Sequence, residues 1–68
     1  MPDSCITLID SLVAERKRQG LTQKEHADAA HLTQSVIARL ESKRCIPNLD
    51  TLFRVVSALG CTLSLVPA

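Results

Sequence analysis

Aromatic residues are almost absent from this 68-residue chain, in which Phe53 is the only one. Proteins that bind single-stranded nucleic acids stack the bases on aromatic rings, so this composition argues against that class. Aliphatic residues and alanine must fill the core, which favours close-packed helices. A chain of this length forms one domain at most, and its small core makes a partner surface an expectation.

Cysteine is scarce and follows no pattern. Cys5, Cys45 and Cys61 are odd in number, far apart and in no C-x-x-C pair. Such a set fits a reducing cytosol better than a disulfide framework. Residues 1–9 lack the basic start and the apolar run of a signal peptide, and no stretch approaches transmembrane length. We therefore expect a cytoplasmic protein with no membrane partner.

The sequence also lacks the patterns of enzymes and metal proteins. It contains no Ser-His-Asp order, no glycine-rich phosphate loop and no paired-carboxylate pocket. His26 and His31 are five residues apart, which does not align them on one helical face, and no cysteine is near them in sequence. We expect no enzymatic activity, no metal site and no cofactor.

Positive charge is concentrated in one part of the chain, although the net charge is only +1. Residues 16–44 hold seven basic and three acidic residues, a net charge of +4, and the remainder carries −3. This asymmetry is the electrostatic footprint expected of a nucleic-acid-binding surface on one part of the fold.

Caps and apolar spacing predict a helix at each end of the helical region. Ser4 is expected to cap the first helix, which ends near Gln19. Asn48 or Asp50 is expected to cap the last helix. Glycine follows each of these helices, at positions 20 and 60, as a stop signal.

Two shorter helices with a tight turn between them are predicted in the middle. Thr22 is expected to cap one of them, to about Ala30, and forms a capping box with Glu25. Thr33 is expected to cap the next, to about Ser42. Two capped amphipathic helices in about twenty residues make a helix-turn-helix, whose second helix enters the major groove of DNA.

The last segment alternates in polarity with period two. Thr62 and Ser64 alternate with apolar neighbours, which is typical of a β-strand. A single strand in a helical domain has no partner in its own chain, and an unpaired edge is a liability. Pairing with the same strand of a second subunit across a two-fold axis would cover it. The expected dimerisation residues are Thr62, Leu63, Ser64, Leu65 and Val66.

Four motifs between residues 15 and 60 match one family. They are Arg16-x-x-x-Gly20-Leu21-Thr22-Gln23-x-Glu25-x-Ala27, Thr33-Gln34-Ser35-x-Ile37-x-Arg39-x-Glu41, Pro47-x-Leu49-x-Thr51-Leu52 and Ala58-Leu59-Gly60. Together they resemble the Cro/C1-type helix-turn-helix domains, the XRE family. The resemblance implies an all-α, lambda-repressor-like bundle of four or five helices, with a structural ion pair between Arg16 and Glu41. The trailing strand looks more specifically like that of HipB-type antitoxins, whose C-terminal strands pair across a dimer.

Three residues depart from the family pattern. His31 stands where glycine is usual in the interhelix turn, a position that requires a left-handed backbone. Lys43 replaces a usual glycine after the third helix, and His26 occupies a core-facing position usually given to leucine. These departures bear on local stability more than on the fold.

The third helix carries the residues expected to contact bases. Gln34 can bond bidentately to adenine, and Arg39 can do so to guanine. Ser35 lies four positions before Arg39, on the same face. The alternatives are simple exposure for Gln34 and Ser35, and an ion pair or a phosphate contact for Arg39. Val36 is either a contact to a thymine methyl group or a core residue.

Gln23, Lys24, Lys43 and Arg44 are expected to contact phosphates. Gln23 opens the second helix, and the N–H groups and dipole of a helix N-terminus favour an anion. The resemblance also implies a bond from Gln23 to Gln34, which would orient that amide towards a base. The alternative for the three cations is a solvated charged loop.

These observations favour two functions. One is a transcriptional repressor that binds a palindromic operator in double-stranded DNA as a homodimer. The other is an antitoxin of a HipBA-like toxin–antitoxin system, which neutralises a toxin and autoregulates its operon, and the added strand tilts modestly towards it. A DNA-binding domain cut from a longer regulator is a third possibility. We assign residues 1–60 to the DNA-binding domain and residues 61–68 to the dimerisation strand and tail.

Overall fold

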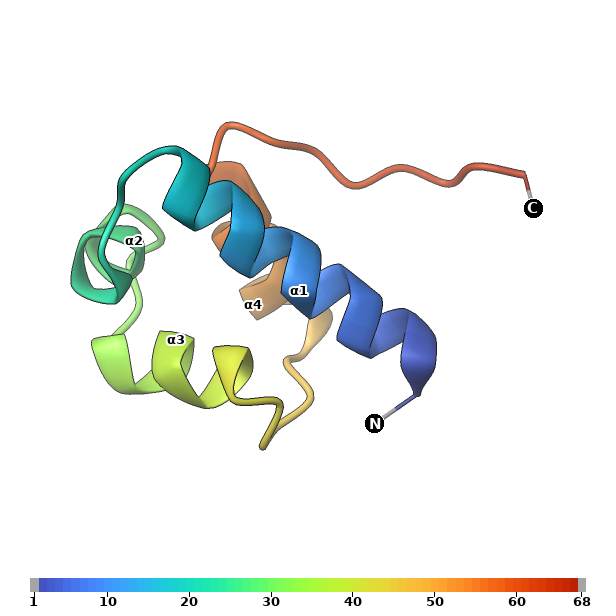
Figure 1. Ribbon diagram of the computed structural model, residues 1–68, viewed down its shortest axis with the longest axis horizontal. Coiled ribbons are helices and arrows are strands. Elements are labelled where there is room, and N and C mark those ends of the chain that lie inside the picture. The colour runs from blue at the N-terminus through green and yellow to red at the C-terminus, as the bar shows by residue number, and fades with distance from the viewer. Residues whose placement is uncertain (1, 68) are drawn as a thin grey trace.

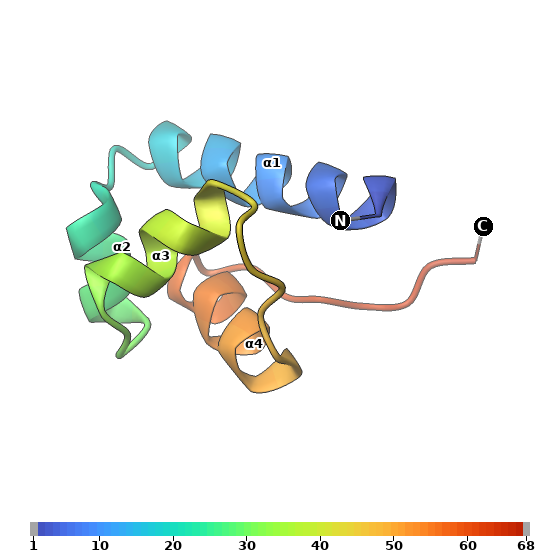
Figure 2. The ribbon, with the colours of Figure 1, turned by 90° about the horizontal axis from the view of Figure 1, so that it is seen from below.

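A computed structural model describes residues 2–67 and places four helices in them. They are α1 (Asp3–Arg18), α2 (Gln23–Ala29), α3 (Gln34–Glu41) and α4 (Leu49–Ala58). Figure 1 shows α2 at one end of the bundle, and Figure 2 shows α1 along one side with the other helices below it. The expected helical bundle is thereby confirmed. Within the described part of the chain, no helix is long and apolar enough to cross a membrane.

Three of the four helices begin at the caps that the sequence predicts. The Thr22 hydroxyl accepts the Glu25 N–H at 3.0 Å, and the Glu25 carboxylate accepts the Thr22 N–H at 2.9 Å, so the capping box is formed. Thr33 and Asn48 each accept the backbone N–H three residues later, at 3.3 and 2.8 Å. These bonds satisfy N–H groups that have no partner inside the helix.

The prediction that Ser4 caps α1 is wrong. The helix already includes Ser4, because it begins at Asp3 and its N-cap is Pro2, which makes no side-chain cap bond. Pro2 has an extended backbone (φ −61°, ψ 151°), and the acidic Asp3 lies in the first turn. A carboxylate there interacts favourably with the helix dipole, which partly replaces the missing cap.

All four helices end in the same backbone motif. At each end, one residue has a left-handed backbone, and the next N–H bonds to the carbonyl five positions back, at 2.9–3.2 Å. This arrangement is the Schellman motif, in which glycine is usual at the left-handed position. The left-handed residues are Gly20, His31, Lys43 and Gly60, with φ of 74°, 58°, 62° and 72°. The left-handed backbone that the sequence requires at residue 31 is therefore confirmed.

The core is aliphatic except for one histidine. Its buried apolar residues come from all four helices: Ile9, Leu12, Ala27, Ile37, Leu40, Val55, Val56 and Leu59. His26 is 1% exposed, as its core-facing position predicts. Its Nε2 lies 2.9 Å from the Val55 carbonyl oxygen, so Nε2 carries the hydrogen and donates it. Nδ1 is buried and has no hydrogen-bond partner among the described residues.

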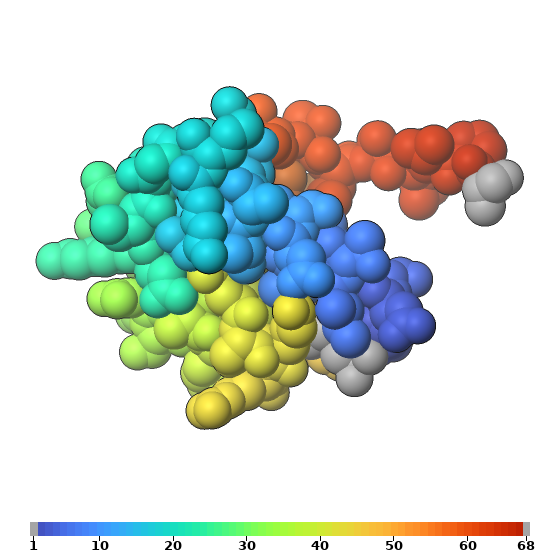
Figure 3. Space-filling model, in the orientation of Figure 1, coloured from blue at the N-terminus to red at the C-terminus, as the bar shows by residue number. Residues whose placement is uncertain are grey.

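Residues 61–67 are extended but form no strand in the single chain. Leu63 packs against the core, whereas Leu65 and Val66 are exposed. Figure 3 shows this segment, in red, projecting beyond the bundle. A strand is defined by a hydrogen-bonded neighbour, and the described part of the chain offers none beside this segment. The expected pairing across a dimer therefore stays a prediction.

Replacing His31 with glycine should stabilise the protein. A side chain in the left-handed region costs about 1 kcal/mol, so His31→Gly should raise the thermal midpoint by roughly 4–8 °C. The matched control is Ala14→Gly at an exposed position inside α1. There glycine should cost about 1 kcal/mol, because the helix is right-handed. A His31→Gly variant that melts below the wild type in calorimetry would contradict this account.

Candidate nucleic-acid interface

The outer face of α3 carries the residues expected to contact bases. Gln34, Ser35 and Arg39 are exposed, and Val36 is half-buried. The opposite side of the same helix carries the buried residues Ile37 and Leu40. The hydrophobic side thus fixes which face of α3 points to solvent, and the three polar side chains share that outward face.

The four residues expected to contact phosphates lie on either side of α3 in the chain. Lys24 is exposed near the start of α2, and Arg44 is exposed two residues beyond Ser42, the C-cap of α3. Lys43 is also exposed, but its Nζ lies 2.6 Å from Asp10 Oδ1 of α1. The sequence analysis missed this partner, because nothing in the local pattern links two positions so far apart.

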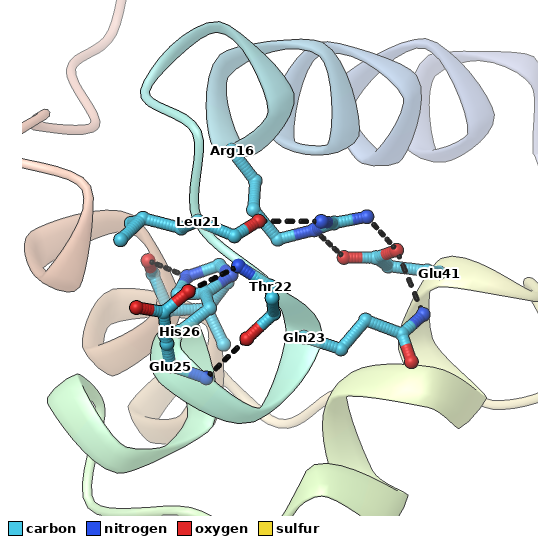
Figure 4. Close-up of polar contacts among 8 residues, drawn as sticks. Arg16, Leu21, Thr22, Gln23, Glu25, His26 and Glu41 are labelled. Atoms are coloured by element: carbon cyan, nitrogen blue, oxygen red, sulfur yellow. Dashed lines mark hydrogen bonds and ion pairs between the residues drawn. The ribbon is translucent and has the colours of Figure 1, made fainter.

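A partly buried carboxylate, that of Glu41, joins α1, α2 and α3 (Figure 4). Glu41, the last residue of α3, accepts hydrogen bonds from Arg16 Nε at 2.7 Å and Nη2 at 2.9 Å. Arg16 lies on α1 and also donates from Nη1 to the Leu21 carbonyl oxygen at 2.8 Å. The structure thus brings Arg16 and Glu41 together as a bidentate ion pair, with only 10% and 12% of the two side chains exposed.

Gln23 has a different partner from the one that the resemblance implied. Its Nε2 donates to Glu41 Oε1 at 3.1 Å, and no hydrogen bond between the described residues joins it to Gln34. Gln23 is the first residue of α2, so this amide ties the start of α2 to the end of α3.

The network changes the acid–base behaviour of Glu41. Burial alone raises the pKa of this carboxyl, but hydrogen bonds from Arg16 and Gln23 and the Arg16 charge outweigh burial. The net result is a pKa below the ordinary value of 4.5, so the carboxylate stays ionised in the folded protein. On the surface, hydrogen bonds from Arg18 and Gln19 lower the pKa of Glu15 to about 2.

Ion pairs with carboxylates leave only a few basic side chains free to bind an anionic ligand. Arg16, Arg18, Lys43 and Arg54 are each paired with a carboxylate: Glu41, Glu15, Asp10 and Asp50 respectively. Within residues 2–67, the cations outside these pairs are Lys17, Lys24, Arg39 and Arg44. Three of the four belong to the helix-turn-helix or the loop that follows it, so the positive potential is concentrated there.

Known proteins resemble this chain in sequence and in fold. A sequence model of a helix-turn-helix family matches residues 12–66, which cover all of α2, α3 and α4. The chain belongs to the XRE-type helix-turn-helix family. This finding agrees with the family that the motifs of residues 15–60 indicated.

Two curated relatives of this family are regulators. An uncharacterized HTH-type transcriptional regulator of Haemophilus influenzae is 37% identical over 62 residues, which are 91% of this chain and 63% of that protein. The immunity repressor protein of Bacillus phage phi105 is 38% identical over 61 residues, 90% of this chain and 42% of the repressor. The chain thus spans less than two thirds of the length of either relative.

A solved structure of the family has the same fold. It is described as a toxin–antitoxin module from Streptococcus pneumoniae, and it superposes with a TM-score of 0.78 at 35% sequence identity. The match covers 96% of this chain and 71% of the other. The resemblance to XRE-type regulators is therefore confirmed, and a toxin–antitoxin module is among the structural neighbours of this chain.

Removing the Glu41 charge should destabilise the protein and weaken its sensitivity to acid. Glu41→Gln keeps the shape but weakens the bonds from Arg16, which should cost about 1.5–3 kcal/mol at pH 7. Because the folded pKa lies below the unfolded one, the wild-type carboxylate stabilises the fold above pH 4.5 and loses this effect as pH falls.

Urea unfolding of both proteins from pH 7 to pH 2 measures this contribution. The gap in free energy of unfolding between wild type and Glu41→Gln should narrow below pH 4.5. Asp28→Asn is the control, since Asp28 is exposed on α2 and in no ion pair with another described residue. A gap that stays constant down to pH 2 would show that the Glu41 charge does not support the fold.

Proposed function

We propose that this protein is a transcriptional repressor that binds a palindromic operator in double-stranded DNA as a homodimer. The observation that carries the proposal is the outward face of α3, on which Gln34, Ser35 and Arg39 are exposed together. An amide and a guanidinium on one helix face can pair with base edges in the major groove. Membership of the XRE-type family and the repressor among its relatives support it.

Phosphate contacts would set the register of that helix on the duplex. In this proposal a phosphate lies at the start of α2, which the Gln23–Glu41 bond ties to the end of α3. Lys24 and Arg44 add charge on the two sides of α3, and Lys43 adds to it once released from Asp10. Such contacts position the protein but carry no sequence information, which comes from the base contacts.

The C-terminal segment supports the homodimer. Leu65 and Val66 are exposed, and Leu65 lines an open, largely apolar groove together with Leu49, Phe53, Leu63 and Ser64. Residues 55–67 carry no charged side chain. A second copy supplies an extended, uncharged segment for both the unpaired backbone and the apolar groove, and two-fold symmetry satisfies both chains at once.

A second function is favoured by the solved toxin–antitoxin module that shares this fold. In this alternative, the protein is an antitoxin that binds a toxin and represses its own operon through the same α3 face. An adjacent reading frame for a kinase-like or nuclease-like protein, whose product co-purifies with this chain, would support it. If no such reading frame is adjacent, only the first function, that of a transcriptional repressor, would remain.

Selection of bound duplexes from a random pool, at stated salt, tests the DNA-binding proposal. We expect an inverted repeat with half-sites about one helical turn apart, roughly 10 bp centre to centre. Arg39→Ala and Gln34→Ala should cost about 1–3 kcal/mol of discrimination at single positions of each half-site.

Arg44→Ala is the matched control for these variants. It should weaken binding about equally on all sequences and reduce the salt slope by about one unit per subunit. If Arg39→Ala left the ranking of operator variants unchanged, Arg39 would not be a base-reading residue. Recovery of no common sequence by the wild type would refute sequence-specific binding altogether.

Removing residues 61–68 should convert the dimer into a monomer. The deletion removes the proposed paired segment but none of the helices, so helical circular dichroism should be retained. Sedimentation should then show a monomer at micromolar concentration, with operator binding sharply weakened. Leu65→Asp in the full chain provides a point variant, since a carboxylate would be buried at the same interface. A truncated chain that stays dimeric would rule out this segment as the interface.

A further inference from the structure

The ion pair between Lys43 and Asp10 has no role in the fold core or in the family motifs. It joins the loop after α3 to the middle of α1, and Figure 3 shows the residues after α3, in yellow, against the α1 surface, in blue. Both side chains are partly exposed, at 35% for Lys43 and 60% for Asp10. An exposed ion pair of this kind adds little to the stability of the fold.

We propose that Asp10 is an internal competitor for DNA phosphate at Lys43 and thereby sets the affinity and the salt dependence of DNA binding. This inference rests on the proposed function, since it requires that the protein binds duplex DNA. Its basis is the 2.6 Å separation between Lys43 Nζ and Asp10 Oδ1, which is the distance of a direct ion pair.

The backbone of Lys43 makes this competition possible. Lys43 is the left-handed residue of the Schellman motif that ends α3, and its N–H bonds to the Leu40 carbonyl oxygen at 3.0 Å. The main chain is therefore fixed at the end of the proposed recognition helix, and only the flexible side chain has two choices. In the free protein the ammonium binds the Asp10 carboxylate, and in the complex it binds a phosphate of similar charge.

The competition has three physical consequences for DNA binding. Phosphate must displace a carboxylate that is already in place, which lowers the gain from Lys43. The displaced Asp10 also remains beside the loop, where its charge repels the duplex. Because the ammonium is already neutralised in the free protein, Lys43 contributes less than a full charge to the release of counterions from DNA.

Asp10→Asn tests this inference by direct titration of a fixed duplex taken from the random-pool selection. The variant should bind about two- to fivefold more tightly per subunit at low salt, the range that an exposed ion pair is worth. The plot of log affinity against log salt should become steeper by up to about 0.9 per subunit, the value for one full phosphate contact. A merely structural effect of Asp10 would change affinity without changing this slope.

The matched control is Asp50→Asn. It removes the same charge and also ends an exposed ion pair, with Arg54 at 3.1 Å, but that pair lies on α4 outside the proposed interface. Its gain in affinity should be smaller, and its salt slope should equal that of the wild type. If the two variants gained equally in affinity and had equal salt slopes, the change in net charge alone would explain the effect. This result would overturn the inference. Thermal midpoints of all variants check that the fold is kept.

A double-mutant cycle with Lys43→Gln shows whether Asp10 acts through Lys43. In that background, Asp10→Asn should lose most of its gain, since no ammonium is left to release. A gain as large as in the wild type would mean that Asp10 repels DNA on its own, which contradicts competition at Lys43. A wild type that binds no duplex would refute the proposed function and, with it, this inference. A wild type that binds normally while Asp10→Asn gains nothing would refute the inference alone.

Discussion

A single, partly buried carboxylate ties together the three helices of the candidate interface. Glu41 is the last residue of α3 and binds Arg16 of α1 and Gln23, the first residue of α2. The two helices of the helix-turn-helix have seven and eight residues, and isolated helices of that length are not stable in water. Their mutual angle must therefore come from tertiary contacts. Because Glu41 accepts bonds from both neighbours, the loss of any partner leaves polar groups unpaired in a largely buried site.

The hydrophobic core could not fix this geometry alone. Its apolar side chains are aliphatic residues and alanine, and the one aromatic residue, Phe53, is 45% exposed and lies outside it. His26 takes the place of an apolar residue and bonds the Val55 carbonyl, but its Nδ1 is buried without a partner among the described residues. An unsatisfied buried group costs about 1–3 kcal/mol, which is a large share of the stability of a small domain. In a core of this kind, directional polar contacts contribute a larger part of the free energy of unfolding. A partner surface that buries further apolar area would add to it.

The features that could be predicted from the sequence are those decided within a few residues. Thr22, Thr33 and Asn48 cap their helices because a side-chain oxygen reaches an N–H three positions on. The left-handed backbone at His31 was indicated by the glycine that is usual at this position in the family pattern. Ser4 failed as a cap because Pro2 and Asp3 already allow the helix to begin earlier. The outward face of α3 was also predictable, since Ile37 and Leu40 fix which side is buried.

The contacts that escaped prediction join positions far apart in the chain. Gln23 bonds Glu41 instead of Gln34, Gln19 donates to the Leu59 carbonyl oxygen at 2.7 Å, and Lys43 pairs with Asp10. Each depends on how the helices pack, because long side chains choose among all partners within reach. The pairing of residues 61–66 is a different case: the alternation of polar and apolar residues predicts it, and it stays a prediction because it requires a second chain.

Charge pairing explains how a chain with a net charge of only +1 can present a DNA-binding surface. Half of its eight basic residues are paired with carboxylates, and most of the others lie in the helix-turn-helix or just after it. Phosphate contacts supply affinity for any sequence, whereas base contacts supply the difference between sequences. A protein with few free cations gains little on random DNA. In the proposed complex, the contacts of α3 with base edges therefore make up a larger share of the binding free energy. Discrimination between DNA sequences would then depend on the small number of free cations as well as on Gln34 and Arg39.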